Sequence, residues 1–139
     1  MSLKITLREN NIKSNKSYKK WFARPVHIGE VHTEDIAKKI QRNSTFSQGT
    51  VKGVIDDFIQ EMKMNMGDGQ TVVIDGLGRF ELTIESEGVD DPKEFRINKH
   101  IKKVKCKFLQ AGKREMDGTL SFQLSKDADV DWAPGVWDK

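Results

Sequence analysis

The chain of 139 residues is long enough for one domain and short for two, and 36% of its residues are hydrophobic and 32% charged. This balance is typical of globular proteins rather than disordered chains, and no apolar run approaches the roughly 18 residues of a membrane span. The single cysteine cannot form an internal disulfide, and three scattered histidines give no metal-ligand spacing. The first residues lack the apolar stretch of a secretion signal. We therefore expect a cytoplasmic protein without metal or cofactor.

The net charge of +3 is unevenly distributed along the chain. Residues 1–26 carry seven basic residues against Glu9 alone, and residues 96–107 carry six basic residues and no acid. Between these segments, residues 84–95 carry five acids and one lysine. Clustered basic segments favour a polyanion such as nucleic acid as partner, although a charge run is also typical of a plain solvated face.

The N-terminal 26 residues predict two short strands. Leu3, Ile5 and Leu7 alternate with polar residues, and residues 18–27 predict a second strand that ends near Pro25. The Asn-, Lys- and Ser-rich residues 10–17 between them predict a loop. Two interpretations of Trp21 and Phe22 remain open: they stack on nucleic-acid bases, or they pack an added strand on the domain.

Two helices should follow. Thr33 is a suitable N-cap, with acids at the next two positions, and this helix should stop near Asn43. Ser47 should cap a longer helix that ends at Gly67 and Gly69. Seven apolar residues in this second helix step by three and four and form one stripe, which we interpret as core: Val51, Val54, Ile55, Phe58, Ile59, Met62 and Met66.

The hydrophobic period then changes to two. Val72 and Ile74, the turn Asp75-Gly76-Leu77-Gly78, and the alternating Phe80, Leu82 and Ile84 predict a β-hairpin. A phosphate-binding loop at this turn is disfavoured because the lysine and helix that it needs are missing.

A polar excursion follows from Glu85 to Asn98, which nearly lacks apolar anchors and should be mobile. Alternation resumes at Val104, Cys106 and Phe108, which predicts a buried Cys106 and places Lys103, Lys105 and Lys107 on the opposite face.

The C-terminal residues give weaker signals. Asp117-Gly118 predicts another hairpin between Arg114 and Leu124, and the acidic tail from Asp127 to Asp138 should be loosely held.

His27, His32 and His100 have no Ser, Cys or Asp at a spacing that favours catalysis, so we interpret them as surface or satisfied polar residues. We expect no catalytic residues and no enzyme activity.

This order of elements resembles the HU and integration-host-factor family. Residues 73–80, Val-Ile-Asp-Gly-Leu-Gly-Arg-Phe, are similar to that family's Gly-Phe-Gly-Thr-Phe turn between two strands. Residues 104–113 are similar to its third strand, which ends in Phe and leads to a Ser-Gly-Lys helix start. The resemblance covers roughly residues 33–113 and is strongest with longer variants. We accordingly divide the chain into a basic extension (1–26), an HU-like domain (27–113) and a C-terminal extension (114–139).

The resemblance implies an α+β fold with a two-helix body, an antiparallel sheet and an arm, assembled as an intertwined homodimer. In that family the sheets form a saddle for double-stranded DNA, and two arms enter the minor groove and bend it. The residues independently favour a dimer, because the apolar stripe of the second helix is wider than one thin sheet can cover.

Two features depart from the family pattern. The family's arm is basic and carries a Pro wedge at its tip, whereas residues 85–92 here are acidic and only Pro92 corresponds to the wedge. Gly118 and the alternation after it indicate that the usual C-terminal helix is replaced.

The candidate DNA-binding residues are basic side chains of the third strand, of the hairpin and of the arm: Lys103, Lys105, Lys107, Arg79, Lys102, Arg96 and Lys99. Two functions compete. The first is a sequence-tolerant, architectural DNA-binding protein of the nucleoid. The second is an HU-like fold used for protein–protein assembly with little DNA binding. Neither involves a membrane or a small-molecule substrate.

Overall fold

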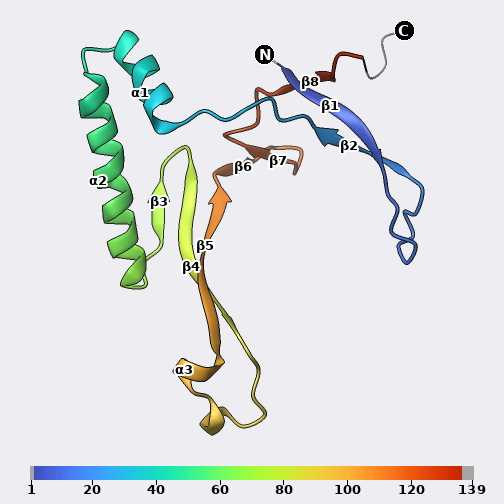
Figure 1. The fold of residues 1–139 in the computed structure, drawn as a ribbon, viewed down its shortest axis with the longest axis vertical. Coiled ribbons are helices and arrows are strands. Elements are labelled where there is room, and N and C mark those ends of the chain that lie inside the picture. The colour runs from blue at the N-terminus through green and yellow to red at the C-terminus, as the bar shows by residue number, and fades with distance from the viewer. Residues whose placement is uncertain (1, 136–139) are drawn as a thin grey trace. The chain divides into compact units, whose positions relative to one another are not determined.

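The computed structural model describes residues 2–135 and contains two compact units (Figure 1). The first unit contains the described residues up to Val31 together with those from Ser125 onward, and the second spans His32–Leu124. Each unit has its own sheet, so each is described by itself.

The first unit is a three-stranded sheet. Strands β1 (Ser2–Glu9) and β2 (Trp21–Pro25) pair antiparallel, which confirms the two predicted strands and the loop between them. The third strand, β8 (Asp129–Trp132), pairs parallel with the other edge of β1, so the sheet order is β2-β1-β8.

Strand β8 corrects the prediction of a loosely held acidic tail. Residues 129–132 are fixed because the open edge of β1 offers its backbone groups, and because Lys4 Nζ lies 2.6 Å from Asp131 Oδ2. The hydrogen bond from Lys4 holds the pKa of Asp131 below its usual value. Residues 136–138 of the predicted tail lie outside the described residues.

The second unit begins with helices α1 (Thr33–Arg42) and α2 (Gln48–Gly67), which confirms both predicted helices. The N-cap of α1 is His32 rather than Thr33, because the Asp35 carboxylate accepts the backbone N–H of His32 at 3.1 Å and starts the helix one residue earlier. Ser47 caps α2 as predicted, with its Oγ accepting the backbone N–H of Thr50 at 3.1 Å.

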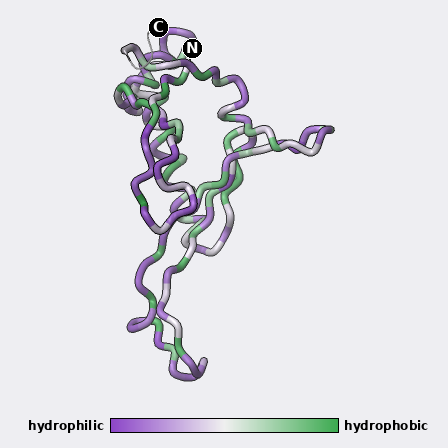
Figure 2. Tube along the Cα trace, turned by 90° about the vertical axis from the view of Figure 1, so that its right-hand side faces the viewer, coloured by the Kyte–Doolittle hydropathy of each residue, from purple (hydrophilic) through white to green (hydrophobic). Residues whose placement is uncertain are grey.

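The apolar stripe of α2 is only partly buried within one chain. Met66 is buried, whereas Val54, Phe58 and Ile59 are 63%, 46% and 49% exposed. This partial exposure agrees with the expectation that the stripe is wider than one sheet can cover, since α2 contacts the sheet mainly through β3 and β4. Figure 2 shows apolar and polar residues interspersed along most of the chain trace.

The central sheet has the order β3-β4-β5, with antiparallel neighbours throughout. Its strands are β3 (Val72–Ile74), β4 (Gly78–Ser86) and β5 (Ile101–Gln110), which confirms the hairpin and the returning strand. Gly76 turns the chain at a φ of 80°. The rings of Phe80 and Phe108 lie directly opposite each other with centroids 4.7 Å apart.

Gly78 allows β5 to approach the turn. Its φ is 150°, and a Cβ at this position would lie 2.3 Å from the carbonyl oxygen of Leu109 and 2.6 Å from the ring of Phe108. Because the nearest of these atoms belongs to backbone, no side-chain rotation could relieve the overlap. Only glycine fits here.

Cys106 corrects a prediction. Alternation places it on the apolar face as expected, but it is exposed in the single chain, with its Sγ 4.0 Å from Met66 Sδ. Leu82, Ile84 and Val104 on the same face are 41%, 64% and 55% exposed, so α2 covers only part of this face.

The excursion contains more structure than its polarity suggested. It holds the 3-10 helix η1 (Pro92–Glu94) and the short helix α3 (Ile97–His100). The buried His100 joins them: its Nδ1 accepts the backbone N–H of Arg96 at 2.8 Å, and its ring lies 5.2 Å from that of Phe95. The expectation that the excursion nearly lacks apolar anchors is therefore wrong, because Phe95 is one. That the excursion is mobile stays a prediction.

The hairpin of β6 (Gly112–Arg114) and β7 (Leu120–Phe122) confirms the prediction around Asp117-Gly118. The Asp117 carboxylate accepts hydrogen bonds from the hydroxyl and backbone N–H of Thr119, and these bonds lower its pKa. No helix occurs between residues 114 and 135, in agreement with the predicted replacement of a C-terminal helix.

We expect Gly78→Ala to lower the free energy of unfolding by about 2 kcal/mol or more, because β5 must move away from β4. Gly88→Ala is the matched control, since nothing lies within 4 Å of its added Cβ and its φ is not left-handed. Chemical denaturation of both variants measures the difference. Equal stability of the two would show that the approach of β5 to Gly78 is not a constraint on the fold.

Candidate nucleic-acid interface

One face of the β4–β5 ladder carries a row of lysines. Lys103, Lys105 and Lys107 lie opposite Glu85, Thr83 and Glu81 of β4. Directly opposed residues of antiparallel strands share a face, so the three lysines share a face with Arg79, which follows at the next outward position of β4. All four basic side chains are exposed. We call these four residues the basic sheet face.

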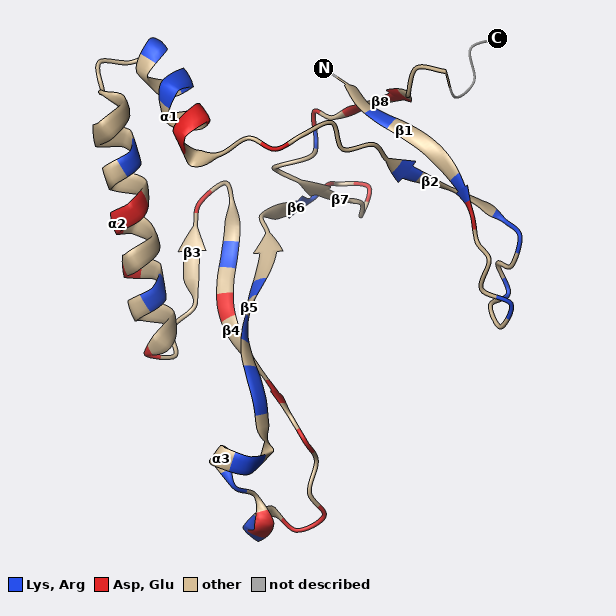
Figure 3. Cartoon of the chain, viewed as in Figure 1, with Lys and Arg blue, Asp and Glu red and all other residues tan. Residues whose placement is uncertain are grey.

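Acidic residues of β4 partly neutralise the basic sheet face. Glu85 Oε2 lies 2.8 Å from Lys105 Nζ and 3.7 Å from Lys103 Nζ. Figure 3 shows the two signs of charge side by side on these strands. The sequence placed Glu85 in the excursion, but the ladder continues to Ser86 and brings its carboxylate against the lysines. Within the described chain, Lys107 and Arg79 form no ion pair.

The remaining candidate residues lie elsewhere. Lys102 falls where the ladder register shifts, between the pairs Glu85–Lys103 and Ser86–Ile101, so it has no partner on β4 and does not belong to the row. Lys99 is exposed on α3. The Arg96 guanidinium donates to the carbonyl oxygens of Lys93 and Phe95, at 2.7 and 3.0 Å, which stabilises the arm.

Pro92 is exposed and is the first residue of η1, in the connection between β4 and β5. The carboxylate of the neighbouring Asp91 accepts the backbone N–H of Lys93 at 2.9 Å, so an acid is fixed beside the proline. A phosphate backbone would be repelled there. This arrangement disfavours insertion of Pro92 between bases.

Other kinds of site have little support in the part of the chain that the structure describes. Residues 2–135 contain no group of three or more His, Cys, Asp or Glu side chains that could hold a metal ion. No helix among them has the length and apolar character needed to cross a membrane.

A protein-family model described as "HU domain fused to wHTH, Ig, or Glycine-rich motif" matches residues 1–124. The chain belongs to this HU-HIG family. The match confirms the resemblance to HU that the turn at Gly76-Leu77-Gly78 suggested, and it includes the N-terminal strands as well as the HU-like part.

A solved structure supports the same fold. The chain is similar to the crystal structure of a "putative bacterial DNA binding protein" from Bacteroides vulgatus ATCC 8482, with a TM-score of 0.60 and 15% sequence identity. The alignment covers 96% of this chain and 50% of that protein, so this HU-HIG chain spans half the length of the solved relative. A search of curated proteins gave no match. The α+β fold with two main helices and antiparallel sheets is confirmed.

We expect Glu85→Gln to raise the affinity for duplex DNA about two- to fivefold at low salt, because it frees Lys103 and Lys105 for phosphates. Glu61→Gln, which removes the same charge from an exposed position on α2, is the control and should have little effect. Fluorescence anisotropy with a labelled duplex measures both. If Glu85→Gln binds duplex DNA no more tightly than the parent protein, these ion pairs do not compete with DNA.

Proposed function

We propose that this HU-HIG chain is a non-enzymatic, largely sequence-tolerant DNA-binding protein of the architectural type, acting in the cytoplasm at the nucleoid. Its domain limits remain those proposed from the sequence, with the HU-like domain at 27–113. The observation that carries the proposal is the row of Lys103, Lys105 and Lys107 beside Arg79 on one exposed sheet face of an HU-family chain.

The spacing of this row suits a DNA backbone. Side chains two residues apart on a strand stand about 6.8 Å apart, which is twice the axial rise of about 3.4 Å per phosphate on one DNA strand. A lysine ammonium acts as a point charge and makes contacts with phosphate that carry no base information. Tolerance of sequence follows from that chemistry.

A homodimer is the second part of the proposal. The exposed Phe58 and Ile59 of α2, and Leu82, Ile84 and Phe108 of the sheet, form apolar surface that one chain leaves open to water. A hollow of about 320 Å³ between the helices is also lined mainly by apolar residues, among them Ile40, Phe46 and Val54. A second copy would cover such surface and double the basic sheet face.

The acidic arm favours one alternative function. Glu85 occupies two lysines, and residues 87–91 add three acids that would lie near a bound duplex. An HU-like fold used for protein–protein assembly, with little DNA binding, accounts for these charges. Titration with duplex DNA at low salt separates the two functions.

The triple variant Lys103→Gln, Lys105→Gln, Lys107→Gln should bind duplex DNA at least about tenfold more weakly, with a slope of log affinity against log salt flatter by about 2–5. Its stability should hardly change because the lysines are exposed. The control removes Lys38, Lys39 and Lys63 from exposed helix positions. Equal affinity and slope for the row variant and the parent would refute the proposed interface.

Sedimentation equilibrium at micromolar concentration should give about twice the chain mass of 15.9 kDa. Phe58→Ala should destabilise the protein by about 3–5 kcal/mol, because a dimer would bury this ring, which is 46% exposed in one chain. Lys63→Ala on the same helix is the control. A monomer whose melting midpoint is insensitive to Phe58→Ala would contradict the dimer.

A further inference from the structure

The first unit carries a basic face of its own, unrelated to the β4–β5 ladder. On β1 and β2, Arg8 lies opposite Phe22 and Thr6 lies opposite Arg24, so the two arginines and the phenylalanine share one face of the sheet. Alternation places Leu7 and Trp21 on the other face. One face of this small sheet therefore brings two guanidinium groups and one aromatic ring together.

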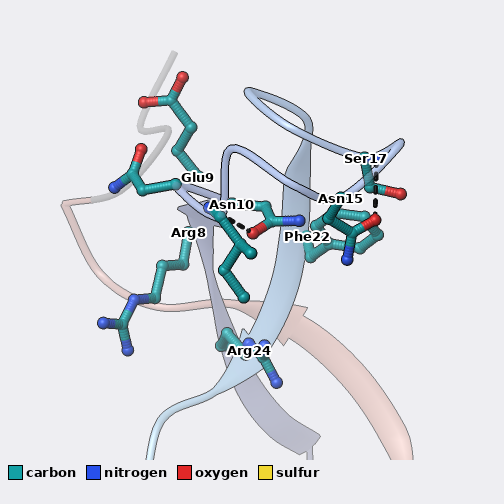
Figure 4. A pocket seen from close by; sticks show the side chains of 9 residues that line it. Arg8, Glu9, Asn10, Asn15, Ser17, Phe22 and Arg24 are labelled. Atoms are coloured by element: carbon teal, nitrogen blue, oxygen red, sulfur yellow. Dashed lines mark hydrogen bonds between the residues drawn. The ribbon is translucent and has the colours of Figure 1, made fainter.

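A hollow of about 570 Å³ lies on the basic side (Figure 4). The strands contribute Arg8, Phe22 and Arg24 to its lining, and the loop between them contributes Asn10, Asn15 and Ser17. Glu9 also lines it, but Figure 4 shows its carboxylate directed away from the Arg8 guanidinium. The volume lies within the range of about 300–1,000 Å³ typical of ligand sites and exceeds what a lone phosphate would fill.

The loop above the hollow has a fixed conformation. Asn10 Oδ1 accepts the backbone N–H of Ile12 at 3.1 Å, and Asn15 Oδ1 accepts that of Ser17 at 3.0 Å. Two backbone bonds close the loop, from Asn10 N to Lys20 O at 2.9 Å and from Lys19 N to Asn10 O at 2.8 Å. These bonds hold both asparagine side chains against the loop backbone.

The charges around the hollow favour an anionic ligand. Among residues 2–135, Lys4 on the same face is neutralised by Asp131, whereas Arg8 and Arg24 form no ion pair. The loop adds Lys13, Lys16, Lys19 and Lys20 with no acid between them. Two guanidinium groups line the hollow together with one aromatic ring that is 43% exposed, and the lysine-rich loop borders it.

We propose that this hollow binds single-stranded nucleic acid. One unpaired base stacks on Phe22, the adjoining phosphates contact Arg8 and Arg24, and the loop lysines follow the strand. An unpaired base can reach the ring, whereas a base inside a duplex is already stacked on its neighbours. This site goes beyond the proposed duplex-binding function, because it uses different residues in a different unit.

The test uses the full chain and two labelled probes, a thymidine 12-mer and a 12-base-pair duplex, in anisotropy titrations. Arg8→Gln with Arg24→Gln should weaken binding of the single strand at least about tenfold. Phe22→Leu should weaken it about five- to tenfold, and Phe22→Tyr should restore it because the tyrosine ring also stacks. The charge-matched control, Lys38→Gln with Lys63→Gln, should stay within about twofold of the parent.

The background variant with Lys103, Lys105 and Lys107 replaced by Gln separates this site from the proposed function. It should keep its single-strand affinity within about twofold of the parent while it loses duplex affinity. If the parent itself does not bind duplex DNA, the proposed function fails, but the single-strand titration still tests this site. Single-strand binding that is insensitive to the arginine pair overturns the proposal. So does an arginine effect equal on both probes with no effect of Phe22→Leu, since the arginines would then contact the phosphates of either probe without any base stacking on Phe22. Melting curves identify any variant that fails to fold. If Phe22→Leu does not fold, the single-strand affinities of Phe22→Tyr and Phe22→His are compared instead to test the role of the ring.

Discussion

The close approach of β5 to the turn at Gly78 is the constraint on which the second unit depends. Without a side chain at this position, the backbone of Leu109 passes close to the turn, and the ladder can run unbroken from Gly78–Gln110 to Glu85–Lys103. The register of that ladder decides which residues face outward. A slip of one residue would exchange Lys103, Lys105 and Lys107 for Val104, Cys106 and Phe108. Both the basic sheet face and the apolar face opposite it therefore follow from one tight contact.

The same alternation couples the two proposed properties of the chain. Because side chains alternate along β5, the neighbours of the outward-facing lysines are apolar residues on the side of the sheet that faces α2. The helix is too narrow to cover all of these apolar side chains. Leu82 and Ile84 remain largely exposed as a result. A chain that presents this basic row therefore also exposes apolar surface to water. In the proposed dimer, a second copy would cover that surface and would add a second basic row.

Local patterns predicted most of the elements. The Ser47 cap, the period of three to four in α2 and the Asp-Gly turns are set by residues close in sequence, and the structure places them as expected. What the sequence did not reveal depends on distant partners. Strand β8 exists because β1, whose Lys4 is 127 residues away from Asp131, has a free edge. Exposure of Cys106 likewise depends on what covers the sheet.

The candidate site shows the same division between local and distant information. The sequence placed Lys103, Lys105 and Lys107 on one face with Arg79, because strand alternation is local. It missed the two ion pairs of Glu85, since the length of β4 beyond Ile84 depends on its pairing with β5. The hollow beside Phe22 also escaped prediction, although both of its components were visible: basic residues near Phe22, and asparagines at turn-forming positions.

Ion pairs within a binding face change what the face can recognise. Glu85 pairs with Lys103 and Lys105 in the absence of a ligand, so a phosphate at these lysines would compete with a carboxylate. Each such exchange replaces one ion pair by another and contributes less to affinity than an unopposed lysine, whereas Lys107 and Arg79 meet no such competitor among the described residues. Affinity for a polyanion should then be concentrated at the turn end of the ladder, beside Gly78, and weakest toward the acidic arm. A basic arm would give the opposite gradient, and the gradient here favours contact through the basic sheet face over contact through the acidic arm.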